Sequence, residues 1–124
     1  MTWTIWHNPR CGKSRQTLAL LRAQGIEPEI FLYLKTPPDR ERLEAALQRL
    51  GLSAVNLVRQ RERVFKELGL NRDELNHDQC LQAMVDQPIL IERPIVEFGS
   101  SARIGRPPET VLELLNCPPD TQLG

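Results

Sequence analysis

The stretch HNPRCGKSRQT, residues 7–17, decides how this sequence is interpreted. Before it lies WTIW, residues 3–6, which is aromatic and β-branched and stops at Asn8, so it predicts a strand. After it, apolar residues without strict alternation predict a helix over residues 13–24, and Gly25 follows as a helix-stop signal. The stretch is therefore expected to be the turn that joins a strand to a helix.

A helical region is expected in the middle of the chain. The sequence TPPD at residues 36–39 has a capping-box pattern with proline at the first helical position, and the helix that it opens ends at Gly51. Residues 55–85 are typical of further helix, broken near Gly69, and Asn76 is a plausible cap for the last piece.

Strands flank this region on both sides. EIFLYL at residues 29–34 predicts a second strand, and two strands at 94–98 and 101–104 predict a hairpin around Gly99. A closing helix is expected over residues 107–115.

The element order is thus β-α-β, then a helical segment, then β-β-α. It matches an α/β, thioredoxin-like fold with a mixed four-stranded sheet. We expect one domain over residues 1–116, with a helical insertion at about 39–86, and a flexible tail at 117–124.

Composition narrows the function classes. Lys plus Arg equals Asp plus Glu, at 16 each, so no net charge attracts nucleic acid or an anionic membrane. The positive charge is local, because Arg10, Lys13 and Arg15 lie in a stretch without carboxylates, which predicts binding of a small anion.

We find no signal peptide and no apolar run of membrane-spanning length, so a cytoplasmic location is expected. Three cysteines and two histidines lack the spacing of metal ligands, so no metal is expected.

The residues Gly12-Lys13-Ser14 match the end of the nucleotide-binding P-loop motif, G-x-x-x-x-G-K-[ST]. A P-loop requires its first glycine where this chain has His7, and Pro9 removes one of the N–H groups that surround phosphates. No downstream apolar strand ends in an aspartate that would hold magnesium. The nucleotide hypothesis is therefore disfavoured.

A reactive thiol is the stronger hypothesis. Cys11 is expected at or near the helix N-cap, where the helix dipole and the nearby basic residues His7, Arg10, Lys13 and Arg15 favour thiolate. The exposed N–H groups of the same turn also form an anion site. The alternative is that Cys11 is a small buried apolar residue.

The other cysteines are assigned lesser roles. Cys80, in DQCLQAMV, is expected to pack in the core, and Cys117 lies in the predicted tail. Ser14 stands where a C-x-x-C pair would place its second cysteine, so an external thiol must complete any redox cycle.

With the stretch at residues 7–17 and further segments downstream, the sequence resembles the glutaredoxin-dependent arsenate reductases, a thioredoxin-like family. HNPRCGKSRQTL is similar to the active-site motif of that family, and further similar segments follow in order: LVR at 57–59, KELGL at 66–70, QPILIERPIV at 87–96 and GRPPE at 105–109.

The resemblance implies specific site residues. Cys11 would attack arsenate, and three arginines would hold the oxyanion: Arg59, Arg93 and Arg106. It also implies that His7 helps to keep the thiol ionised, and Arg10, Lys13 and Ser14 are expected to stabilise the thiolate beside it. Pro94 is expected to follow a cis peptide bond. Guanidinium groups match oxyanions with paired donors, so the arginine set is chemically reasonable.

The resemblance also implies the reaction partners. Arsenate or a similar oxyanion would be the substrate, glutathione the co-substrate and glutaredoxin the protein partner, with no bound cofactor. Arg10 and Lys13 replace small neutral residues that flank the cysteine in family members with established activity, so the reaction class is better defined than the substrate.

Two alternatives remain open. Related proteins of the same fold bind RNA polymerase as redox-responsive regulators, in which case Cys11 would be a sensor. A general glutathione-linked thiol oxidoreductase would instead use the arginines to bind glutathione carboxylates. His77 is expected to be a surface residue at a helix start rather than a catalyst.

Overall fold

A computed structural model describes residues 2–59, 62–69 and 75–116 of the chain. The chain divides into two compact units, Met1–Thr36 with Arg93–Gly124, and Pro37–Glu92. The helical insertion expected at about 39–86 falls within the second unit. The predicted tail at 117–124, with Cys117, lies outside the described residues.

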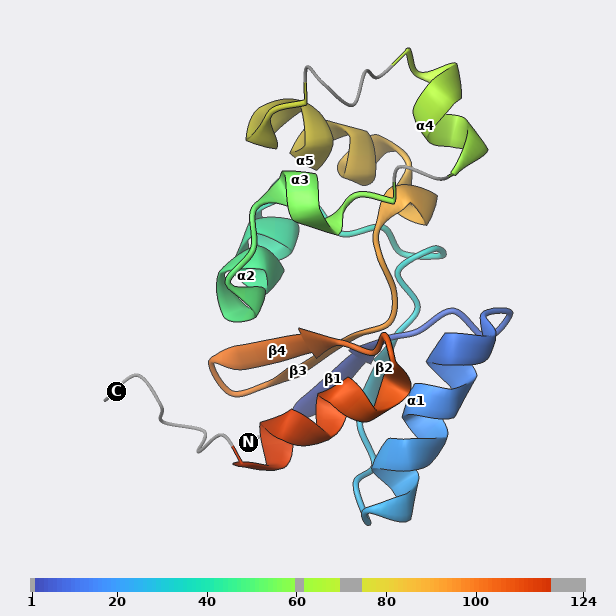
Figure 1. The fold of residues 1–124 in the computed structure, drawn as a ribbon, viewed down its shortest axis with the longest axis vertical. Helices are drawn as coiled ribbons and strands as arrows, with labels where there is room; N and C mark the ends of the chain where they lie inside the picture. The colour runs from blue at the N-terminus through green and yellow to red at the C-terminus, as the bar shows by residue number, and fades with distance from the viewer. Residues whose placement is uncertain (1, 60–61, 70–74, 117–124) are drawn as a thin grey trace. The chain divides into compact units, whose positions relative to one another are not determined.

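The first unit is built on a four-stranded sheet (Figure 1). Its strands are β1 (Trp3–Trp6), β2 (Glu29–Phe31), β3 (Ile95–Phe98) and β4 (Ser101–Ile104), in the order β2-β1-β3-β4. β1 is parallel to β2, whereas the β1–β3 and β3–β4 pairs are antiparallel. The prediction of a mixed four-stranded sheet in a thioredoxin-like α/β fold is confirmed.

Helices α1 (Gly12–Ala23) and η3 (Pro108–Asn116) pack on one face of this sheet, as the blue and red helices of Figure 1 show. Alternate strand residues face them, because successive side chains of a strand point to opposite faces. The buried cluster between these helices and the sheet consists of Ile5, Leu18, Leu21, Val96, Val111 and Leu114. This packing fixes α1, and with it the strand-to-helix turn that holds Cys11.

The opposite face of the sheet contains a buried polar pair. Trp6 is fully buried and donates from Nε1 to Oε1 of Glu97, at 3.0 Å. Its ring also packs edge-on against Phe31, with the ring centroids 4.9 Å apart. The indole N–H therefore gives the buried carboxylate of Glu97 a hydrogen-bond partner, as buried polar groups require.

The second unit is helical. It contains α2 (Arg40–Leu50), α3 (Ala54–Leu57), α4 (Arg63–Glu67), α5 (His77–Asp86) and the 3₁₀ turn η2 (Pro88–Leu90).

Two helix signals in this unit are confirmed. Gly51 ends α2 with a φ of 72°, a conformation that favours glycine, and Asn76 caps α5 by accepting from the N–H of Gln79 at 2.8 Å. The start of α2 differs from the prediction, because its cap is Asp39, which accepts from the N–H of Arg42, rather than Thr36.

Several predicted bounds change for identifiable reasons. β2 stops at Phe31 rather than 34, because the N–H groups of Lys35 and Thr36 both bond to the carbonyl of Leu32 and turn the chain. The predicted helix over 55–85 is interrupted after Leu57, where Val58 pairs with Ile91 as an isolated antiparallel bridge.

The closing helix also differs from the prediction. It is a 3₁₀ helix that begins at Pro108 rather than an α-helix from Pro107. In the described part of the chain, no helix combines the length and the apolar character that a membrane crossing requires.

Candidate active site

The turn between β1 and α1 brings Cys11 to the start of the helix. The N–H of Cys11 donates to the carbonyl of Asn8 at 2.9 Å, with Pro9 at the second position of the turn, where its fixed φ is favourable. The side chain of Asn8 accepts from the N–H of Arg10 at 3.0 Å and tightens the turn further. Cys11 itself is the N-cap of α1, with extended backbone angles, as predicted.

The surroundings of Cys11 favour its thiolate. Burial opposes ionisation, but a hydrogen bond from the backbone N–H of Ser14, the Arg93 side chain and the N–H of Lys13 outweigh it, so the pKa of Cys11 is lowered from 9.0. Cys11 is half-buried, so the sulfur remains reachable. A lowered pKa together with access is the environment of a reactive cysteine rather than of a packed one.

Ser14 connects this turn to the end of β1. Its hydroxyl oxygen accepts from the N–H of Asn8 at 3.0 Å and lies 2.6 Å from Nδ1 of His7. Ser14 is fully buried, and His7 and Asn8 are nearly so. The three residues hold the backbone of the turn, and the Ser14 N–H that faces Cys11 belongs to the same cluster.

His7 is held in an environment that disfavours its charge. Burial, followed by the positive charges of Arg22 and Arg15, lowers the pKa of His7 from 6.5. The Ser14 hydroxyl already accepts from Asn8, so its own proton is available to Nδ1 of a neutral His7. His7 is therefore connected to the turn that holds Cys11 through Ser14, and its role in keeping the thiol ionised stays a prediction from the resemblance.

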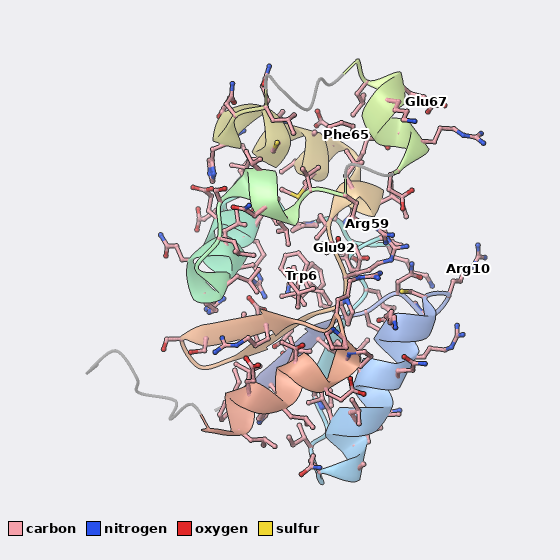
Figure 2. All side chains as sticks on the ribbon, in the orientation of Figure 1. Trp6, Arg10, Arg59, Phe65, Glu67 and Glu92 are labelled. Carbon is pink, nitrogen blue, oxygen red and sulfur yellow. The ribbon has the colours of Figure 1, made fainter. Side chains whose placement is uncertain are left out.

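The basic residues next to Cys11 take different positions. Arg10 is exposed at the N-terminal end of α1 and points away from the helix in Figure 2. Lys13 is also exposed, and its backbone N–H is the group that acts on Cys11. Arg15 folds back, and its Nη1 donates to the carbonyl of Pro9 at 2.8 Å.

The segment before β3 supplies Arg93. The Arg93–Pro94 bond is cis, as the resemblance implied, and Nε and Nη1 of Arg93 are buried. Arg106 joins this segment from the end of β4, because its Nε donates to the carbonyl of Arg93 at 2.7 Å. The first unit thus places the Arg93 side chain and the N–H groups of Lys13 and Ser14 at Cys11, and Arg106 at the backbone of Arg93.

Sequence reasoning missed the importance of Gly105. Its N–H donates to the carbonyl of Pro94 at 2.8 Å, which ties the segment before β3 to the end of β4. A Cβ on Gly105 would lie 2.6 Å from Oγ1 of Thr17 and 2.8 Å from Cγ of Pro94. Only glycine fits this close approach of α1, Pro94 and the β4 end. The glycine of GRPPE was the available signal, but its role depends on tertiary packing.

Arg59 belongs to the second unit. Its N–H donates to the carbonyl of Leu90 at 2.6 Å, and its Nε lies 3.7 Å from Glu62 and 3.6 Å from Glu92. Figure 2 shows Arg59 and Glu92 side by side. Its role in oxyanion binding stays a prediction from the resemblance.

Cys80 and His77 have the structural positions that the sequence predicted for them. Cys80 is fully buried and burial raises its pKa, which confirms the packed role expected of it. His77 begins α5 at the surface, accepting from the N–H of Ala54 at 3.1 Å and lying 2.7 Å from Oε1 of Glu44, as a surface residue at a helix start. Within residues 2–59, 62–69 and 75–116, no group of three or more His, Cys, Asp or Glu side chains is arranged to hold a metal ion.

Comparison with known proteins identifies relatives along nearly the whole chain. The sequence model of the ArsC family matches residues 6–114. Arsenate reductase of Rhizobium meliloti (strain 1021) is 46% identical over 124 residues, which cover 100% of this chain and 86% of that protein. The uncharacterized protein YfgD of Escherichia coli (strain K12) is 54% identical over 112 residues, covering 90% and 94% of the two chains. The solved structure of arsenate reductase from Vibrio cholerae is 49% identical, with a TM-score of 0.86, and the match covers 91% of this chain and 97% of that one.

Proposed function

Because the chain belongs to the ArsC family, we propose that it reduces arsenate to arsenite with Cys11 as the nucleophile and with glutathione and glutaredoxin as the source of electrons. The observation that supports this most is the position of Cys11. Its lowered pKa comes from the N–H groups of Ser14 and Lys13 and from Arg93, against the opposing effect of burial.

The chemistry requires a nucleophile and an anion cradle in one place. The Cys11 thiolate attacks arsenic, an S–As bond forms, and one arsenate oxygen leaves as water after protonation. The N–H groups at the start of α1 and the guanidinium of Arg93 are the donors that offset the charge of the oxyanion. Arg106 is held against the backbone of Arg93 and extends the same donor set.

Reduction follows at the sulfur. Glutathione attacks the Cys11 sulfur, an S–S bond forms, and the electron pair of the S–As bond passes to arsenic, which leaves as arsenite. The two sulfurs lose two electrons in total and arsenic gains them. A glutaredoxin thiolate then attacks the glutathione sulfur of the mixed disulfide, Cys11 leaves as a thiolate, and glutathione stays in a disulfide with glutaredoxin.

Two features of the described residues support an external reductant. Cys11 is a free cysteine, and the other free cysteine described, Cys80, is fully buried in the second unit. Ser14 occupies the position of a C-x-x-C partner, where its hydroxyl holds His7 and Asn8 instead. Arg59 is proposed as a third oxyanion ligand on the resemblance alone.

The test is NADPH oxidation by the purified chain with arsenate, glutathione, glutathione reductase and glutaredoxin. We expect oxidation that depends on arsenate, is lost in Cys11→Ser and is retained in Cys80→Ala. A parallel reaction with thioredoxin and thioredoxin reductase should be slower. Oxidation supported by glutathionylated peptides without any response to arsenate would instead indicate a general thiol oxidoreductase.

A further inference from the structure

A surface cavity of about 500 Å³, open to solvent, lies on the first unit beside the turn that holds Cys11. Two elements line it: the turn after β1, with His7 and Pro9, and one side of α1, with Arg15, Leu18, Ala19 and Arg22. The volume is within the usual range of small-molecule sites, about 300–1,000 Å³. The arsenate chemistry proposed above uses none of the α1 residues that line this cavity.

The lining combines cations with an apolar floor. Leu18, Ala19 and Pro9 supply apolar surface, and the guanidinium groups of Arg15 and Arg22 supply charge. After burial, the positive charges of Arg22 and Arg15 lower the pKa of His7, which lines the same cavity. A ligand with a carboxylate and a short apolar stem complements such a lining.

Both arginines are available to an incoming carboxylate. Arg15 donates to a neutral carbonyl, that of Pro9, so this contact does not neutralise its charge. Arg22 donates from Nε and Nη2 to the carboxylate of Glu27, with a shortest distance of 2.9 Å, but the two side chains are 49% and 71% exposed. Solvent and salt screen an exposed pair of this kind, so a ligand carboxylate can compete with Glu27 for Arg22.

The cavity is within reach of the reactive sulfur. The guanidinium of Arg15 lies at the carbonyl of Pro9, two residues before Cys11, and two residues of chain span at most about 7 Å, and less in a closed turn such as this one. In glutathione, the thiol and the glycine carboxylate belong to adjacent residues and are separated by about the same distance when the peptide is extended. A carboxylate held by Arg15 therefore leaves the thiol close to Cys11.

We propose that this cavity binds the terminal carboxylate of glutathione, or of a similar small thiol peptide, and so positions its thiol to attack Cys11. The proposal rests on the function proposed above, because that function is what requires such a thiol. Arg15 is the anchor, Arg22 the second cation, and Leu18 and Ala19 the surface on which the peptide stem lies.

The test separates binding from chemistry by using S-methylglutathione, which cannot react with Cys11. Its titration into the labelled full chain, followed by amide chemical shifts, should perturb Arg15, Leu18 and Ala19. Ala19→Glu places a carboxylate in the cavity and should weaken binding by about tenfold or more. Ala23→Glu adds the same charge one turn later, at an exposed position outside the cavity, and should change the Kd by less than about twofold. The diethyl ester of S-methylglutathione, which lacks free carboxylates, should bind as weakly to the wild-type chain as the parent binds to Ala19→Glu.

Equal affinity of the Ala19→Glu and Ala23→Glu variants, or perturbations confined to the residues around Pro94 and Gly105, would overturn the proposal. Displacement of S-methylglutathione by millimolar phosphate, with no preference over the ester, would also overturn it, because it would indicate a general anion site. These binding measurements contain no arsenate, so their results do not depend on whether the chain reduces it. Arsenate turnover with an unchanged KM for glutathione in Ala19→Glu would contradict only the cavity, and selective binding without any arsenate turnover would contradict only the proposed function.

Discussion

The hydroxyl oxygen of Ser14 lies 2.6 Å from Nδ1 of His7, and both residues are buried. The same oxygen accepts from the N–H of Asn8 at 3.0 Å. One side chain thus joins the end of β1, the turn and the first turn of α1, and the N–H of that same serine acts on the Cys11 sulfur. The lowered pKa of Cys11 and the local fold of the turn therefore both involve Ser14.

Ser14→Ala is expected to lower the free energy of unfolding by about 1–3 kcal/mol, because it leaves a buried N–H and a buried imidazole nitrogen without their partner. Urea unfolding monitored by tryptophan fluorescence measures this change. Gln16→Ala, at an exposed position on the same helix, should stay within about 0.5 kcal/mol of the wild type. Equal effects of the two substitutions would contradict the role given to the Ser14 hydroxyl.

His7 predicts a loss of stability in acid. Its pKa in the folded chain lies below the ordinary 6.5, because of burial and then of Arg22 and Arg15, so the unfolded chain binds more protons between the two values. The free energy of unfolding should therefore fall as the pH drops through this window, and His7→Gln should reduce the slope. The measurement is urea unfolding of both proteins at a series of pH values from neutral down to acid. An unchanged slope in the variant would show that His7 does not make this contribution.

Arg93→Ala is expected to raise the pKa of Cys11, because it removes a hydrogen bond and a positive charge from the thiolate. The rate of alkylation by iodoacetamide rises as the pH passes through the Cys11 pKa, so its midpoint should move to higher pH in the variant. Arg10→Ala is the matched control, since Arg10 is exposed and points away from α1 (Figure 2), and it should shift the midpoint less. A larger shift for Arg10→Ala would contradict this assignment.

Gly105→Ala is expected to destabilise the chain by about 1–3 kcal/mol, because the added methyl would lie 2.6 Å from Thr17 and 2.8 Å from Pro94. It should also weaken oxyanion binding, since the carbonyl of Pro94 is held by the N–H of Gly105. Gly12→Ala is a useful comparison, because a Cβ there meets only a flexible arginine nitrogen at 3.9 Å. Thermal unfolding with and without arsenate measures both effects, and similar melting temperatures for the two variants would contradict the steric argument.

Local patterns in the sequence were sufficient for much of the fold. The strand at 3–6, the helix after Cys11 and the hairpin around Gly99 follow from residue types within a few positions, and the structure has all three. The predicted cis bond before Pro94 came from the resemblance instead, and the structure has it too.

The site required tertiary information that no local pattern contains. The contact of Arg106 with the carbonyl of Arg93 joins residues 13 positions apart, and the tight packing of Gly105 on Thr17 joins positions still further apart. The sequence places His7 near several basic residues, which suggested that His7 itself adds positive charge beside Cys11. Burial and then the charges of Arg22, which is distant in sequence, and Arg15 lower its pKa, because like charges disfavour the protonated form.

The most direct test of the central claim is a single turnover of arsenate and glutathione by the wild-type chain, without glutaredoxin. Arsenite is quantified, and the protein is analysed by intact mass and peptide mapping. We predict one arsenite per chain and one glutathione in disulfide linkage at Cys11, with neither product in Cys11→Ser. Arsenite formation by Cys11→Ser, or glutathione attached at Cys80 while Cys11 stays free, would contradict the account.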